Sequence, residues 1–383
     1  MDKQADKPTD MPTMQSDATS ENFGGAISRR DLLRTAGAGA LLAATGGLSS
    51  CARTMAKLGM PGHVAPGDFP KPRFINTNGI RMAIYERGEG LPVVFSHGFP
   101  ELGYSWRNQI PALANAGFRA IVPDQRGYGL TDRPEGIDQY TIHHLTGDLV
   151  GLLDELGLEK AIFVGHDWGG FIAWMMPLLH PERTAGVIGV NTPYMPRAPL
   201  PPLQMMESLF GEDFYIIYFQ EPGPAEALLG GDTEKTFTRM LRTNAMTQEQ
   251  MDNLPPEVRN MSFEKLWSTD APLTGQALVT GKELAYYVKT FERTGFTGGL
   301  NWYRNMQSNW ETTADLGKKI MVPSLMISAE FDFILRPELA NMMDPFVPDL
   351  EKHIIADCGH WTQQEKPEQL NSLIIDWLTR RFS

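Results

Sequence analysis

The segment GHDWGG at residues 165–170 contains the side chain best placed for chemistry in this chain, Asp167. An apolar run at residues 161–164 precedes it and a helix-like stretch at residues 171–179 follows, the strand-turn-helix context of a nucleophile elbow. A carboxylate at the apex of such a turn is ionised at neutral pH, because its reference pKa is about 4, and its attack on an sp3 carbon gives an alkyl ester. The alternative is that Asp167 only caps the helix.

Two further side chains follow expected strands nearer the C-terminus. Asp332 comes after a buried strand expected at residues 320–328, and His360 follows an apolar run at residues 353–356. The chain order is therefore nucleophile, acid, base, each at a strand end, as in the α/β-hydrolase arrangement. Alone, Asp332 could cap a helix near Pro337 and His360 could be a packed loop histidine. Together they predict a general base, His360, oriented by Asp332.

A fourth motif, SHGFP at residues 96–100, ends the apolar run 92–95. Backbone N–H groups of Phe99 and Trp168 are predicted to form an oxyanion hole, with His97 and Pro100 supporting the turn. By itself the motif could be a simple strand-terminating turn. Its pairing with the elbow favours the catalytic interpretation.

Taken together, these motifs resemble the epoxide hydrolases of the α/β-hydrolase superfamily, close to the C-terminal domain of the soluble epoxide hydrolases. The resemblance covers roughly residues 73–380. It rests on HGFPE (97–101), GHDWGG (165–170), NTPY (191–194), FYIIYFQEPGPAE (214–226), NWYRNM (301–306), AEFDF (329–333) and CGHWTQ (358–363).

The resemblance implies a pair of lid tyrosines, Tyr215 and Tyr303, that donate hydrogen bonds to an epoxide oxygen. Tyr218 competes with Tyr215 for this role, since it lies three residues further along a helix, and both tyrosines could instead be packing residues. The implied reaction opens an apolar epoxide on Asp167 and hydrolyses the ester to a vicinal diol, with no metal or organic cofactor.

Two other functions remain open at this point. Haloalkane dehalogenases are similar and also use an aspartate, and Trp168 could serve as their halide donor. A halide leaves without protonation, however, and would gain nothing from two phenols. A non-catalytic small-molecule binding protein on the same fold is the second alternative, because a fold does not by itself define a function.

The first 50 residues are expected to be an export signal. The segment SRRDLLR at residues 28–34 resembles a twin-arginine signal, an uncharged apolar stretch covers 36–48, and LSSC at 48–51 resembles a lipobox. We expect lipid modification of Cys51, a flexible stalk over 51–72, and attachment to the membrane of a bacterial cell envelope. The alternatives are a disordered tail and, if the signal is not used, a cytoplasmic protein.

Composition and organisation agree with a single large enzyme domain. The chain has 383 residues, is 42% hydrophobic and carries a net charge of −12, which disfavours nucleic-acid binding. The adjacent His143 and His144 have no cysteine or carboxylate companion at ligand spacing, so no metal site is predicted. Apolar runs alternate with helical patterns, which predicts an α/β fold with a mostly parallel sheet. The core is expected at 73–195 and 313–383, and a helical lid at 196–312, inserted before the last strands.

Overall fold

The computed structural model describes residues 68–243, 246, 250, 253–254, 261–268 and 273–382. The expected export signal at 1–50, Cys51 and the expected stalk up to residue 67 lie outside this range, and so remain predictions. Within the described ranges, the helices are too short or too polar to cross a bilayer.

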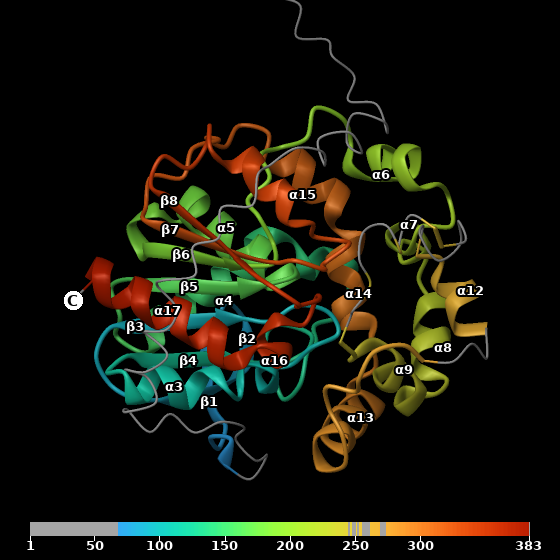
Figure 1. The fold of residues 1–383 in the computed structure, drawn as a ribbon, viewed down its shortest axis with the longest axis horizontal. Helices are drawn as coiled ribbons and strands as arrows, with labels where there is room; N and C mark the ends of the chain where they lie inside the picture. The colour runs from blue at the N-terminus through green and yellow to red at the C-terminus, as the bar shows by residue number, and fades with distance from the viewer. Residues whose placement is uncertain are drawn as a thin grey trace, which may run out of the picture. The chain divides into compact units, whose positions relative to one another are not determined.

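The centre of the structure is an eight-stranded sheet (Figure 1). Its strand order is β1-β2-β4-β3-β5-β6-β7-β8; β1, β2 and β4 pair antiparallel, and all pairs from β4 through β3 to β8 are parallel. This confirms the expected mostly parallel sheet. The strands are β1 Arg73–Thr77, β2 Ile80–Arg87, β3 Pro92–Ser96, β4 Arg119–Pro123, β5 Ala161–His166, β6 Thr184–Val190, β7 Ser324–Ala329 and β8 Leu350–Ile355.

Helices cover both faces of this sheet. The side chains of β3 alternate: Val93 and Phe95 pack in one buried cluster, Val94 in the other. Helices α3 (Gln109–Asn115) and α17 (Pro367–Phe382) complete the first cluster. Helices α4 (Ile142–Glu155) and α5 (Trp168–Leu179) complete the second, which continues into the helices that follow β6. A strand buried on both faces must be apolar along its whole length, which is why the central strands are continuous apolar runs.

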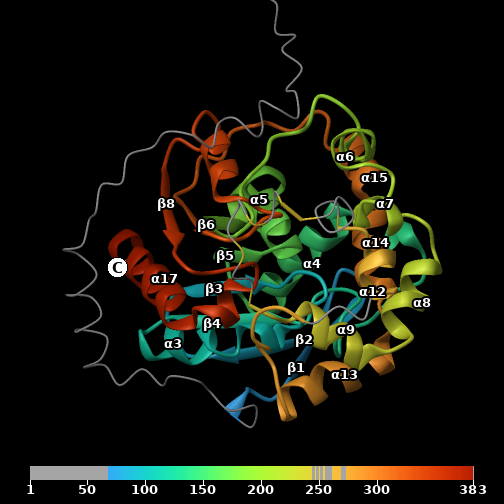
Figure 2. The ribbon, with the colours of Figure 1, turned by 45° about the vertical axis from the view of Figure 1, so that its right-hand side comes forward.

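A helical insertion separates β6 from β7. Its ring contacts with the loops after β3 and β5 place it across the carboxyl ends of the strands, and Figure 2 shows α7 beside α14. The insertion contains α6 Pro202–Phe210, α7 Tyr215–Tyr218, α8 Pro224–Gly230, α9 Thr233–Met240, α12 Phe263–Ser268, α13 Lys282–Thr294, α14 Thr297–Arg304 and α15 Met306–Thr312. Short elements elsewhere are η2 Gly103–Trp106, η3 Ile137–Tyr140, η4 Pro181–Arg183, η5 Pro337–Met343 and α16 Thr362–Glu365.

Two strands begin at other residues than the apolar runs predict. The run that starts at residue 320 enters the sheet only at Ser324 in β7, directly after Pro323, because proline has no N–H to donate to a neighbouring strand. Strand β8 begins at Leu350, earlier than predicted. It lies at the edge of the sheet, where exposed residues such as Lys352 are tolerated.

Candidate active site

Asp167 lies at the turn between β5 and α5, with φ 53° and ψ −124°. Residues other than glycine rarely adopt a positive φ, so the backbone at Asp167 is strained. Close approach of the neighbouring backbone explains two glycines. A Cβ on Gly169 would overlap the carbonyl of Ser96, and a Cβ on Gly98 would overlap the Asp167 carboxylate. The glycines therefore allow Asp167, at the end of β5, to pack closely against the loop that follows β3.

The two predicted oxyanion-hole donors both reach the Asp167 carboxylate. The Phe99 N–H donates to Oδ1 at 2.8 Å, and the Trp168 backbone N–H also donates to this carboxylate. Burial raises the pKa of Asp167, while these two N–H groups and the nearby His360 partly oppose the rise. The same donors are thus in place for an oxyanion that forms on the Asp167 carboxyl carbon.

His360 lies between the two aspartates. Its Nδ1 is 2.8 Å from Asp332 Oδ2, and its Nε2 is 3.8 Å from Asp167 Oδ2. A carboxylate bound to Nδ1 holds the proton there, so Nε2 is the nitrogen available as a base toward Asp167. The structure therefore brings together the three side chains that the sequence placed after β5, β7 and β8.

Hydrogen-bond donors to both oxygens of Asp332 stabilise its ionised form. Asn191 Nδ2 donates to Oδ2 at 2.7 Å, and the Ile334 and Leu335 N–H groups donate to Oδ1 at 3.0 and 2.9 Å. Burial alone would raise the pKa of Asp332, but His360 and these hydrogen bonds outweigh it and hold the pKa well below its usual range. Asp332 is therefore an anion throughout the neutral range.

The interaction between Asp332 and His360 lowers the pKa of Asp332 but raises the pKa of His360. Burial disfavours its cation, but the charge of Asp332, its hydrogen bond and the charge of Asp167 together raise the pKa of His360 to about 9. In the resting site His360 is consequently protonated at neutral pH and forms a charged triad with the two aspartates. A change in the charge of Asp167 must therefore change the basicity of His360.

Tyr215 of α7 and Tyr303 of α14 meet opposite Asp167. Their rings lie 6.0 Å apart, and the Tyr303 ring packs 5.4 Å from Phe99 and 5.0 Å from Trp168. Burial, then the charge of Asp167, raises the pKa of both phenols far above the usual value. Both hydroxyls therefore keep their protons and are hydrogen-bond donors beside a partly buried carboxylate.

Two details distinguish the tyrosines from their competitors. Burial raises the pKa of Tyr218, as do Glu264, Glu221 and Glu226, whereas Asp167 is not among the causes as it is for Tyr215 and Tyr303. The indole of Trp168 makes a side-chain hydrogen bond with Tyr303. Since an indole N–H only donates, the Tyr303 oxygen accepts and its own proton is left for another acceptor.

Of the two residues predicted to support the SHGFP turn, His97 is part of a buried hydrogen-bond network. His97 Nε2 accepts from the Gln125 N–H at 3.1 Å, and its Nδ1 lies 3.0 Å from the Gly98 carbonyl. Burial lowers the pKa of His97 to about 4, so this ring is neutral. The peptide bond between Phe99 and Pro100 is cis.

The structure adds residues that the sequence analysis did not single out. His166, next to the nucleophile, approaches the His360 carbonyl with Nε2 at 2.7 Å, and Gln363 lies 3.2 Å from its Nδ1. Glu365 accepts the N–H groups of Gly359 and Trp361 at 3.0 and 3.1 Å. These contacts fix the loop that carries the base. No pattern in the sequence marked them, because each pairs with a residue whose position depends on the folded loop.

No group of three histidines, cysteines or carboxylates in the described ranges is arranged to hold a metal ion. Cys358, next to this loop, is buried as a free thiol, and burial raises its pKa to about 12. A thiol with so high a pKa is not a nucleophile at neutral pH. The chemistry of the site therefore rests on carboxylates, an imidazole, phenols and backbone N–H groups.

Comparison with known proteins agrees with this geometry. The model of the alpha/beta hydrolase fold family matches residues 92–367. Epoxide hydrolase A of Mycobacterium tuberculosis is 48% identical over 318 residues, which make up 81% of this chain and 98% of that protein. Bifunctional epoxide hydrolase 2 of Sus scrofa is 42% identical over 302 residues, 78% of this chain, and the chain spans 53% of the length of that protein.

Solved structures give the same result. The crystal structure of epoxide hydrolase A from Mycobacterium thermoresistibile has a TM-score of 0.73 and 42% identity, and the match covers 81% of this chain and 98% of that one. The chain therefore belongs to the α/β-hydrolase fold family. Within that family it is a member of the epoxide hydrolases, as the aspartate at its elbow and the two tyrosines opposite had suggested.

Proposed function

We propose that this chain hydrolyses an apolar epoxide to a vicinal diol through an ester on Asp167. The observation that carries the proposal is the convergence of a carboxylate, an imidazole 3.8 Å from it and two protonated phenols, of which Tyr303 is buried and Tyr215 partly buried. An alkoxide leaving group needs a proton donor, and a carboxylate nucleophile needs a base only for its later release. The site supplies both.

In the first step Asp167 attacks one epoxide carbon. Oδ1 is engaged by the Phe99 N–H, so Oδ2 is the oxygen that forms the new C–O bond. The epoxide C–O bond breaks, and its electron pair goes to the oxygen held by Tyr215 and Tyr303, one of which transfers its proton. The phenol that lost its proton is restored from solvent. The product is a hydroxyalkyl ester of Asp167.

The second step is the hydrolysis of this ester. Esterification removes the negative charge of Asp167, which is one of the influences that raise the pKa of His360. The pKa of His360 therefore falls when the ester forms, so the imidazolium releases its proton to solvent and becomes a neutral base. His360 takes a proton from water, the hydroxide adds to the Asp167 carboxyl carbon, and Phe99 and Trp168 stabilise the oxyanion. Collapse of the intermediate breaks the bond between the Asp167 carboxyl carbon and the diol oxygen. This oxygen takes the proton of the new carboxyl group, so the diol leaves and Asp167 is again a carboxylate.

A single-turnover reaction in 18O-labelled water tests this mechanism. With enzyme in excess over styrene oxide, the first diol should be unlabelled, because its new oxygen comes from Asp167. The Asp167 peptide should gain 18O by mass spectrometry. Label in the first diol would mean that water attacks the epoxide directly. Release of halide from a haloalkane, with no diol from styrene oxide, would support the dehalogenase instead.

We further propose that residues 1–50 direct export and that Cys51 carries a lipid anchor. The proposal is supported by the order of the twin arginine, the uncharged apolar stretch and the cysteine. A folded enzyme of this kind suits twin-arginine export. The product would be held at the membrane of a bacterial cell envelope, with its active site on the soluble side.

A further inference from the structure

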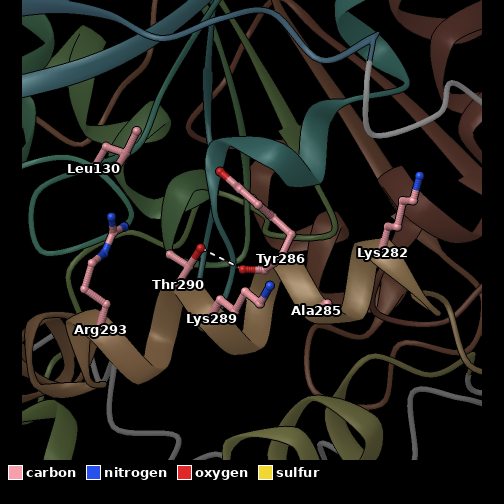
Figure 3. A pocket seen from close by; sticks show the side chains of 7 residues that line it. All are labelled: Leu130, Lys282, Ala285, Tyr286, Lys289, Thr290 and Arg293. Carbon is pink, nitrogen blue, oxygen red and sulfur yellow. Dashed lines mark hydrogen bonds between the residues drawn. The ribbon is translucent and has the colours of Figure 1, made fainter.

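A cavity lies on α13, away from the catalytic residues. It has a volume of about 460 Å³ and is lined by Leu130, Lys282, Ala285, Tyr286, Lys289, Thr290 and Arg293. None of the residues assigned to the epoxide reaction lines it. Figure 3 shows Lys282 and Arg293 at the two ends of this stretch of helix, with Tyr286 between them and Leu130 opposite Arg293. A volume of this size is within the range of small-molecule sites.

Three cations gather at this cavity in a chain whose net charge is −12. Lys282, Lys289 and Arg293 are spaced by seven and four residues, which places them along one side of α13. No carboxylate of the described residues forms an ion pair with any of the three. Such a group of unpaired cations gives a local positive potential that favours an anion.

Contacts with the core of the protein hold Tyr286, which lines the cavity, in place. The Tyr286 hydroxyl hydrogen-bonds with the Tyr85 hydroxyl, and Tyr85 donates in turn to Asp124 Oδ2 at 3.0 Å. The Tyr286 ring also packs 4.8 Å from the ring of Tyr104. These contacts hold the phenol in place whether or not a ligand is bound. The floor is therefore a preformed surface of aromatic and aliphatic carbon, made by Tyr286, Ala285 and Leu130.

Arg293 closes one end of the cavity. Its Nη2 donates to the Gly129 carbonyl at 3.1 Å, which anchors the guanidinium to the loop that follows β4. Its other N–H groups make no hydrogen bond to the described residues. Arg293 also lowers the pKa of Asp124 in part, but that buried carboxylate already accepts from Gly103, Leu130 and Tyr85. An anchored guanidinium with free N–H groups is suited to bind a carboxylate.

We propose that this cavity is a second binding site, for a small organic acid with a carboxylate head and an apolar chain. The carboxylate pairs with Arg293 and Lys289, which lie one helical turn apart on α13, and the chain lies on Tyr286, Ala285 and Leu130. Lys282, at the other end of the cavity, adds to the positive potential. The chemistry follows from the combination: cations alone would suit inorganic phosphate, whereas an apolar floor adds affinity only for a ligand with a hydrocarbon part. The site is independent of the epoxide reaction.

Titration calorimetry with the full chain tests the proposal. Octanoate should bind at one site, more tightly than butyrate, with affinity rising up to about fourfold for each buried methylene. The double variant K282E/K289E should weaken octanoate binding by at least about tenfold. The control K160E makes the same type of change at an exposed lysine away from this cavity, and should bind as the parent chain does. Styrene oxide hydrolysis and thermal unfolding report whether each variant is folded.

Four results would overturn the proposal. One is no octanoate binding, and a second is equal binding of inorganic phosphate, which would leave the apolar floor without a role. A third is octanoate binding that K282E/K289E does not change and that competes with styrene oxide, since it would place the acid in the epoxide site. The fourth is binding of phosphatidylglycerol vesicles without binding of free octanoate, which would make this surface a membrane contact.

Discussion

At the scale of single residues, His360 is the side chain whose protonation the mechanism depends on. The pKa of about 9 in the resting site reflects Asp332 first and Asp167 in addition, against the effect of burial. We expect hydrolysis of the ester to become faster as the pH rises through the pKa of His360, since only the neutral imidazole accepts a proton. That pKa should lie below 9, because the esterified Asp167 carries no charge.

Stopped-flow tryptophan fluorescence under single-turnover conditions would measure the hydrolysis rate against pH. The substitution D332N should lower the pKa of His360 further, because it removes the largest influence that favours the cation. In D332N the rise of the hydrolysis rate with pH should therefore occur at lower pH, and the maximal rate should fall. A hydrolysis rate that does not change with pH would contradict the assignment of His360 as the base.

Removal of the base should stop the reaction at the ester. In H360Q we expect the steady-state rate to fall by roughly 10²- to 10⁴-fold, the usual contribution of a general base. Alkylation should persist, because Asp167 needs no base to attack. Intact-protein mass spectrometry after mixing with styrene oxide should show one added substrate mass, located on the Asp167 peptide. D167N is the control and should gain no mass; an H360Q chain that binds the epoxide without gaining mass would refute the ester.

The two tyrosines should affect the first step of the reaction, the alkylation of Asp167. Y215F and Y303F should each slow alkylation by about 10²-fold, because each removes a proton donor from the leaving oxygen. Y218F is the matched control, since Tyr218 lies only three residues away but Asp167 does not influence its pKa. Its alkylation rate should equal that of the parent chain. Equal loss in Y218F and Y215F would leave no basis for choosing between them.

The side chains of the site were partly predictable from the sequence. Asp167, Asp332 and His360 each follow an apolar run, so the end of a strand locates them without knowledge of the fold. His166 and Glu365 could not be found in this way, because their partners are main-chain groups of the loop around His360. Asn191 directly follows β6 and could have been identified by the same argument as Asp332.

At the scale of elements, a buried ion pair joins the core to the helical insertion. Arg107, which follows η2, donates to Glu283 of α13 at 2.9 Å, and their side chains are 1% and 10% exposed. Removing one partner leaves a buried charge, so E283A should lower the free energy of unfolding by about 3 kcal/mol. Urea denaturation measures the change.

The control for this pair lies on the surface of α17. Asp376 accepts from Arg380 at 2.9 Å, but the side chains are 50% and 46% exposed. D376A should therefore cost less than about 1 kcal/mol. If E283A and D376A were equally mild, the contact between Arg107 and Glu283 would not hold α13 to the core.

The accuracy with which the sequence predicts an element depends on how deeply that element is buried. Strands β3 and β5 are buried on both faces and read as continuous apolar runs, so the sequence locates them well. Strand β1 was missed, because three of its five residues are exposed and its sequence RFINT has no clear periodicity. In the insertion, the four-residue α7 is too short to show a helical period, although it carries Tyr215.

At the scale of the whole molecule, catalysis and attachment are expected to reside in separate parts of the chain. All residues assigned to the reaction, and both buried clusters, lie within the described residues from 68 onward. Phe69 already packs on the body of the enzyme, 4.5 Å from the ring of Tyr85 and 4.9 Å from that of Tyr104. The Asp68 carbonyl accepts from Arg87 at 3.0 Å. A cut before Asp68 therefore removes none of these contacts.

Two variants separate the parts. A chain that starts at Asp68, behind a new initiator methionine, should hydrolyse styrene oxide with the kcat/KM of the full chain. Expressed in a bacterium with a twin-arginine export pathway, it should remain in the soluble cytoplasmic fraction. C51A, in the full chain, should keep its export signal but lose the lipid, so that it leaves the membrane fraction while its activity is unchanged. If C51A stayed with the membrane, another segment would hold the protein there, because a single unmodified alanine offers no anchor.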